Sequence, residues 1–338
     1  MFKTEISPET LTILTTYQCT AACKDCCFEC TPQVSVKLTE EQIKDAILQA
    51  KLNFPLLKQV VFSGGECFML KDTLFRSIAL ATSLGLVTRC VTNAYWAKNR
   101  SRANEIVREL SNSGLTEVNI STGLDHQRWV SLNTVVNALE VLVSHSISTL
   151  ITIESDTETS TCLSDLTQNQ RVQTIRKEHS EKFTLQVNAW MPFHKDSVTR
   201  QVIDIKEIEG GCDQLFNNCV ITANGEIAAC CGLTLEHIDE IKVGKINNLS
   251  DFIINQEDDF LKLWIYTDGP IGIIKTLMGF DYFKEHNVHH QCQACVMLHK
   301  DEAIKKQLSS TWKEHLIPTI QKFNLKKNGI SVKKMEYV

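Results

Sequence analysis

The stretch CTAACKDCC occupies residues 19–27, and Cys30 follows it closely, so five cysteines fall within twelve residues. The chain of 338 residues holds fourteen cysteines, and most of the others gather in two further groups. Disulfide frameworks are typical of small secreted domains. The N-terminal MFKTEISPET has no basic segment followed by an apolar core, so we expect no signal peptide. Grouped cysteines in a reducing compartment indicate metal binding or redox chemistry.

The overall composition is that of a globular protein, with 43% hydrophobic and 22% charged residues. The length predicts one large domain, or one domain with a smaller companion. A formal net charge of -5 argues against a nucleic-acid partner, which would favour a basic surplus. No apolar run approaches the roughly 18 residues that a membrane span requires. We therefore expect a cytoplasmic protein with no membrane span and no nucleic-acid partner.

Short β-rich runs alternate with helical segments over the first two thirds of the chain. The expected strands are 11–16, 58–63, 86–93, 116–122, 148–155 and 183–190. The expected helices are 38–52, 71–85, 100–114, 128–146 and 165–178. This alternation predicts a parallel sheet with crossover helices, in which chemistry gathers at the carboxyl ends of the strands. The first cysteine group and the motif SGGE both follow expected strands.

The strand and helix alternation ends near residue 205. The segment NCVITANGEIAACC predicts a β-hairpin, because Asn224-Gly225 is a strong two-residue turn signal. We expect helices over most of 250–285, and a solvated helix with an extended end over 300–338.

Three cysteines of the first group, Cys19, Cys23 and Cys26, follow the spacing C-x3-C-x2-C. Three thiolates can bind three irons of a [4Fe–4S] cluster, which leaves the fourth iron open, and an open coordination position is a mark of catalysis. The alternative is a structural zinc site, for which Cys27 or Cys30 would supply a fourth ligand.

These cysteines, followed by SGGE after the second expected strand, resemble the radical S-adenosylmethionine (SAM) enzymes. The resemblance implies a partial (β/α)6 barrel, a [4Fe–4S] cluster with an open iron site, and SAM as cofactor. It also implies SAM contacts at the strand ends, made by Ser63, Gly64, Gly65, Glu66, Thr92, Asn93 and Ser121. The chain departs from the family at Asp25, where many members carry an aromatic residue before the third cysteine.

The later cysteines resemble the twitch or SPASM extension, which binds auxiliary iron–sulfur clusters in radical SAM enzymes that modify peptides. The resemblance implies one auxiliary [4Fe–4S] cluster with ligands Cys212, Cys230, Cys292 and Cys295. Two alternatives stay open: Cys219 in place of Cys212, or a zinc ion held by four cysteines. The expected domains are a radical SAM barrel over 1–205, a twitch/SPASM-like subdomain over 206–300, and a helical tail over 301–338.

A narrower resemblance links CCFECTP, SGGECF, TNAYW, GEIAACC and CQAC to the radical SAM peptide epimerases of the YydG type. It implies conversion of L-residues to D-residues in a ribosomally synthesised precursor peptide, with Cys231 as the hydrogen-atom donor. An electron donor such as flavodoxin or ferredoxin is the further expected partner. The alternatives are a peptide cross-linking enzyme that forms thioether or carbon–carbon bonds, a radical SAM enzyme for a small molecule, and a non-catalytic zinc or iron–sulfur protein.

Overall fold

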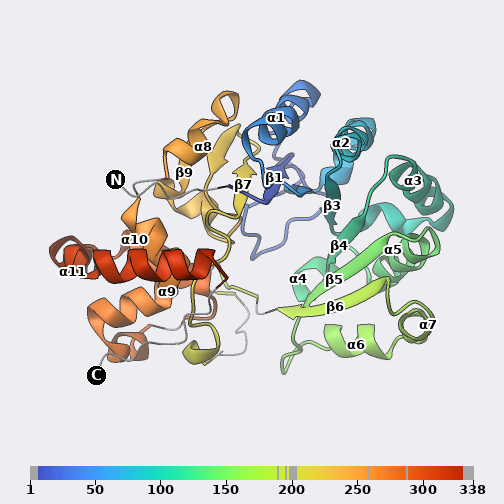
Figure 1. Cartoon of the computed structure of the whole chain (residues 1–338). Helices are drawn as coiled ribbons and strands as arrows, with labels where there is room; N and C mark the ends of the chain where they lie inside the picture. The colour runs from blue at the N-terminus through green and yellow to red at the C-terminus, as the bar shows by residue number, and fades with distance from the viewer. Residues whose placement is uncertain are drawn as a thin grey trace.

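The computed structural model describes residues 7–188, 190–194, 196–197, 204–256, 259–286 and 288–329. Its strands form one nine-stranded sheet in the order β6-β5-β4-β3-β2-β1-β7-β8-β9 (Figure 1). The strands are β1 Thr10–Leu14, β2 Gln59–Ser63, β3 Val87–Thr92, β4 Glu117–Ser121, β5 Ser148–Glu154, β6 Phe183–Asn188, β7 Asn218–Ile221, β8 Glu226–Ala228 and β9 Lys242–Lys245. The strands β1 to β6 are all parallel to their neighbours, which confirms the predicted parallel sheet.

The crossover helices cover the outer side of the curved sheet (Figure 1). They are α1 Glu40–Asn53, α2 Asp72–Ser83, α3 Arg100–Asn112, α5 Leu132–Ser144, α6 Cys162–Gln168 and α7 Gln170–Glu178. The short helix α4 Leu124–Gln127 lies instead just after the carboxyl end of β4. The expected helix 165–178 is two helices, because the Asn169 side chain accepts hydrogen bonds from Arg171 N and Val172 N and so begins α7. The expected helix 128–146 begins later, at Leu132, where Ser131 is the N-cap.

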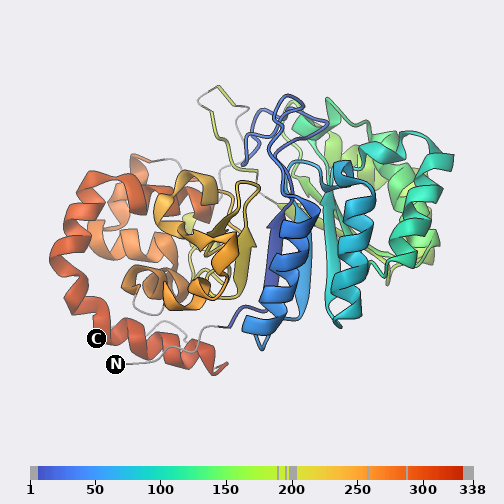
Figure 2. The same cartoon turned by 90° about the horizontal axis from the view of Figure 1, so that it is seen from above.

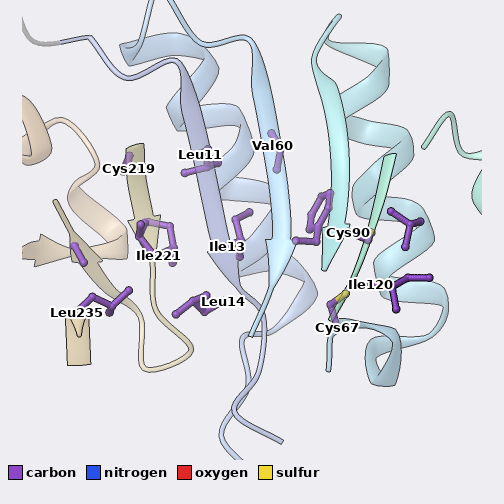
Figure 3. Close-up of a cluster of buried hydrophobic side chains, with 14 of the residues drawn as sticks. Leu11, Ile13, Leu14, Val60, Cys67, Cys90, Ile120, Cys219, Ile221 and Leu235 are labelled. Atoms are coloured by element: carbon purple, nitrogen blue, oxygen red, sulfur yellow. The ribbon is translucent and has the colours of Figure 1, made fainter. Parts of the chain in front are cut away.

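The predicted hairpin is present, with β7 and β8 antiparallel and Gly225 in the left-handed region at φ 74°. The sequence did not indicate that β7 also pairs in parallel with β1, where Leu11 lies opposite Cys219. Side chains of β1 and β7 share one apolar cluster with those of β2, as Figure 3 shows for Leu11, Val60 and Ile221. The barrel sheet therefore continues into the second part of the chain, and the domain boundary at 205/206 stays a prediction.

The C-terminal helices pack beside the hairpin, at the side of the molecule away from α3 and α5 (Figure 2). They are α8 Asp251–Ile254, α9 Phe260–Met278, α10 Gln291–Lys300 and α11 Glu302–Lys327. Short 3-10 turns complete the described elements: η1 Cys67–Leu70, η2 Tyr95–Lys98, η3 Ile205–Glu207, η4 Leu235–His237, η5 Asp239–Ile241, η6 Ile246–Asn248 and η7 Phe280–Lys284. Within the described ranges, none of these helices combines the length and the apolar character that crossing a bilayer requires.

Candidate active site

The loop after β1, which carries the first cysteines, lies directly against the SGGE motif after β2. Gly65 N donates to Thr16 O at 2.6 Å, and Glu66 N donates to Gln18 O at 2.9 Å. A Cβ on Gly65 would lie 2.2 Å from Gln18 O, and one on Gly64, whose φ is +127°, would lie 2.3 Å from Thr16 O. The two glycines are therefore required for the close approach of this turn to the cysteine-bearing loop.

The Glu66 carboxylate is fully buried and joins the ends of β2 and β3. It accepts hydrogen bonds from Thr92 Oγ1 at 2.9 Å, from Asn93 N at 3.0 Å and from Phe68 N at 3.1 Å. Burial raises the pKa of Glu66 to about 7, and the hydrogen bonds oppose that shift. The motif's carboxylate is thus engaged within the chain, where it fixes the two strand ends.

Asn93 connects this network to the first cysteine. Its Nδ2 donates to Thr20 Oγ1 at 3.1 Å and lies 3.6 Å from Cys19 Sγ. The structure therefore brings the predicted residues at the ends of β2 and β3 together with Cys19. Ser121, predicted at the same rim, is half-buried at the end of β4.

The three thiols of C-x3-C-x2-C influence one another through charge. Burial and the charges of Cys26 and Cys19 raise the pKa of Cys23 to about 12. The hydrogen bond with Cys30, together with nearby backbone N–H groups, lowers the pKa of Cys26 to about 6 in spite of burial. One of these groups, Cys30 N, lies 3.4 Å from Cys26 Sγ. Three cysteines on one loop, with one thiol biased toward the thiolate, suit a metal cluster.

Asp25 holds the segment after β6 against the cysteine loop. Its Oδ1 accepts hydrogen bonds from Phe193 N at 2.8 Å and from Ser197 Oγ at 2.5 Å. The neighbouring Lys24 Nζ lies 2.8 Å from Asp196 Oδ2. The residue that departs from the aromatic pattern therefore has a structural task, which is to hold Phe193 and Ser197 against the loop.

The second cysteine group gathers side chains from three parts of the chain. Burial raises the pKa of Cys295, and the charges of Cys230, Cys292 and Cys212 raise it further. A Cβ on Gly232 would lie 3.2 Å from Cys292 Sγ and 3.5 Å from Cys230 Sγ, so these two sulfurs converge on the glycine. The four predicted ligands thus influence one another through charge, and their role as ligands of an iron–sulfur cluster stays a prediction.

Cys219, the alternative to Cys212, lies elsewhere. It is fully buried on β7 opposite Leu11, and burial is the cause that raises its pKa (Figure 3). In the described part of the chain, no three histidine, cysteine or acidic side chains are placed to hold a single metal ion.

The thiols of Cys231 and Cys27 influence each other through charge. Burial raises the pKa of Cys231, and a hydrogen bond with Thr12 on β1 opposes the shift. Burial also raises the pKa of Cys27, and the charges of Cys26, Cys231 and Cys292 add to it, so this thiol is close to members of both groups. The Cys231 thiol is therefore near Thr12 of β1 and near Cys27 of the loop after β1.

Polar residues at the ends of β4 and β5, which the sequence analysis did not select, also belong to this rim. Thr152 Oγ1 donates to Asn119 Oδ1 at 3.0 Å, and Glu154 Oε1 accepts from Leu124 N at 2.6 Å. His126 packs edge-on against Trp190 with ring centroids 5.4 Å apart, and burial lowers its pKa to about 4. For Asn119, Thr152 and Glu154, the signal in the sequence was polar residues at alternate positions of otherwise apolar strands.

Residues 13–153 match the Radical SAM superfamily. The match covers the part of the chain from β1 to β5 and supports a radical SAM domain there. The radical SAM family implies a [4Fe–4S] cluster and SAM, and the three thiols of the first loop fit the cluster's need for cysteine ligands.

Two kinds of relative were found for the chain. It is 21% identical over 132 residues to the "Putative peptide biosynthesis protein YydG" of Bacillus subtilis (strain 168), a match to 39% of this chain and 41% of that protein. The match thus spans about two fifths of the relative. The solved structure "Native anSMEcpe with bound AdoMet and Cp18Cys peptide" covers 94% of this chain and 99% of its own, with a TM-score of 0.56 and 12% identity. "Native anSMEcpe with bound AdoMet" gives a TM-score of 0.56 at 11% identity, covering 94% of this chain and 100% of its own. These two structures share the fold.

Proposed function

We propose that the enzyme modifies a ribosomally synthesised precursor peptide by converting an L-residue to its D-epimer, with Cys231 returning the hydrogen atom. The observation that carries the proposal is the set of groups that act on the Cys231 thiol and respond to it: Thr12 of β1 opposes the rise in its pKa that burial causes, and its charge raises the pKa of Cys27 on the first loop. The relative named as a putative peptide biosynthesis protein supports a peptide as the substrate class.

In this proposal, Cys19, Cys23 and Cys26 hold the [4Fe–4S] cluster, and a second [4Fe–4S] cluster is held by Cys212, Cys230, Cys292 and Cys295. The SAM-binding residues are Ser63, Gly64, Gly65, Glu66, Thr92, Asn93 and Ser121. When bound, the cluster and SAM supply a 5′-deoxyadenosyl radical that removes a hydrogen atom from carbon. The proposed domains are the barrel 1–205, the auxiliary-cluster subdomain 206–300 and the tail 301–338.

The role of Cys231 in this proposal is to donate a hydrogen atom to the carbon radical of the substrate. Its S–H bond breaks as a new C–H bond forms at the α-carbon, on the face opposite to the abstraction, and a Cys231 thiyl is left. Restoring the thiol takes one electron and one proton. A small cytoplasmic donor of the flavodoxin or ferredoxin class supplies the electron, and the protein is accordingly proposed to be cytoplasmic.

The test is anaerobic turnover in deuterated water with SAM and the synthetic peptide encoded beside the gene, read by mass spectrometry. We predict a gain of one mass unit on one residue, because the Cys231 thiol exchanges with solvent. Cys231→Ala should still release 5′-deoxyadenosine but give no deuterated product, and should leave a carbon radical visible by electron paramagnetic resonance.

The matched control is Cys162→Ala, a buried cysteine at the start of α6, which should retain product formation. A loss of two mass units would contradict epimerisation and support cross-linking. An unchanged peptide with continued 5′-deoxyadenosine release would contradict a peptide substrate. Product formation by Cys231→Ala at the wild-type rate would show that Cys231 only packs.

A further inference from the structure

The two edges of the sheet differ in how they are protected. At one edge, β9 is four residues long, carries Lys242 and Lys245, and pairs with β8 through an irregular register. Lysines, bulges and short strands are the features that keep an edge from pairing with another chain. At the other edge, β6 has the sequence FTLQVN, with no charge and no proline. The edge at β6 lacks these protections.

The outward backbone groups of β6 can be assigned from its ladder with β5. Thr149 N donates to Lys182 O at 2.8 Å, and the parallel register then runs from Phe183 opposite Thr149 to Asn188 opposite Glu154. Alternate residues of a parallel strand bond to the same neighbour. The N–H and C=O groups of Leu185 and Val187 therefore point away from β5, and within the described ranges no strand pairs with that side.

The side chains flanking this edge are polar on one face and apolar on the other. Gln186 lies opposite Thr152, and its Nε2 donates to Asn188 Oδ1 at 2.9 Å. On the other face, Val187 lies opposite the buried Ile153 and is 45% exposed. An extended backbone placed along this edge could form hydrogen bonds with the outward N–H and C=O groups of Leu185 and Val187. On one face it would also meet the amide side chains of Gln186 and Asn188.

We propose that the edge of β6 docks the substrate peptide as an added β-strand. In this mode of recognition, main-chain hydrogen bonds give affinity and alternate side-chain contacts give specificity. The inference rests on the proposed function, because it names where the peptide of that reaction binds. The carboxyl end of β6 is connected to the rim that carries the first cysteines, because Phe193, in the segment after β6, donates a hydrogen bond to Asp25 beside Cys26. A peptide docked along β6 thus extends to the cysteine loop.

The first experiment is hydrogen–deuterium exchange on the wild-type enzyme with SAM, with and without the synthetic peptide encoded beside the gene. The amides of Leu185 and Val187 should exchange more slowly when the peptide is bound. The Gln186 amide, which already bonds to β5, should change little. Protection of the C-terminal helices with none at β6 would overturn the docking proposal.

The second experiment compares Val187→Pro with Val187→Ala. Proline removes only an outward N–H and is tolerated on edge strands, so peptide affinity should fall roughly fivefold, the effect of one hydrogen bond. Val187→Ala keeps the N–H and should bind within about twofold of wild type. Release of 5′-deoxyadenosine without peptide should be equal in all three proteins.

The outcomes separate the two proposals. Equal peptide affinity of Val187→Pro and wild type, with the peptide still epimerised, would overturn the docking and leave the function intact. A peptide that protects β6 but is never modified would support the docking and contradict the epimerisation. A wild-type enzyme that neither binds nor modifies the peptide would contradict both.

Discussion

The two cysteine groups of this protein are built in opposite ways. The first lies on one loop, from Cys19 to Cys26. The SGGE turn after β2 and Asn93 after β3 form hydrogen bonds with this loop. The second is assembled from the segment around Cys212, the end of the hairpin, and the first turn of α10. One group is thus local in sequence, and the other exists only because the chain folds back.

The hydrogen bonds that position the second group come from several elements of the chain. Cys212 N donates to Ile265 O on α9 at 3.0 Å, and Thr234 Oγ1 donates to Cys292 O at 3.2 Å. Each thiol therefore depends on a different neighbouring element. A change in packing that spares the first loop can still separate the members of the second group, so the two groups should respond independently to mutation.

The largest effect is expected from Cys19→Ala. With one of three ligands removed, the first cluster should be lost, and release of 5′-deoxyadenosine should fall to background, while the second cluster stays. The measurement is anaerobic turnover with SAM and dithionite, together with iron analysis and electron paramagnetic resonance.

The matched control is Cys30→Ala, which removes a buried neighbour of Cys26 but none of the three proposed ligands. It should keep the cluster. Equal iron loss in both variants would mean that four cysteines bind a closed site, as the zinc alternative requires.

The next effect is expected from Cys292→Ala, compared with Cys219→Ala. The first should lose about half of the iron and keep SAM cleavage, because its proposed partners in the second cluster are Cys212, Cys230 and Cys295. The second removes a fully buried side chain on β7 and should keep all iron, with a loss of about 1 kcal/mol in unfolding free energy. Iron analysis and anaerobic urea unfolding measure the two quantities. Iron loss in Cys219→Ala would restore Cys219 as a ligand.

The same contrast explains what the sequence could reveal. The six parallel strands and the Asn224-Gly225 hairpin follow from local patterns, and the structure confirms them. The pairing of β7 with β1 joins residues that lie far apart in the sequence, so no local pattern carries it.

The residues of the candidate site also differ in whether a local sequence pattern reveals them. The first-loop cysteines and the SGGE motif have a spacing that can be recognised directly. That Cys212 lies near Cys295 could be predicted only from the resemblance to the twitch or SPASM extension. The task of Asp25, which bonds to Phe193 and Ser197, could not be predicted, because it depends on where the chain runs after β6.

The smallest effect is expected within the support of the first group, from Thr92→Val compared with Thr88→Val. Both threonines are buried on β3, but Thr92 donates to the Glu66 carboxylate whereas Thr88 Oγ1 donates to Gly114 O at 3.3 Å. At about pH 8, where Glu66 is charged, Thr92→Val should cost about 1–3 kcal/mol of unfolding free energy, because a buried carboxylate loses a donor. Anaerobic urea unfolding at several pH values measures this cost.

The pH dependence then distinguishes the two variants. Burial raises the folded pKa of Glu66 to about 7 from its ordinary value of 4.5, so its stabilising contribution is full below about pH 4.5 and is lost as the pH rises through 7. Removing the Thr92 donor raises that pKa further, because a hydrogen bond to the charged form favours it. The cost of Thr92→Val should therefore be smaller at about pH 5 than at pH 8, and that of Thr88→Val should be equal at both. A pH-independent cost for Thr92→Val would mean that Glu66 does not titrate in this range, and that its hydrogen bonds outweigh its burial.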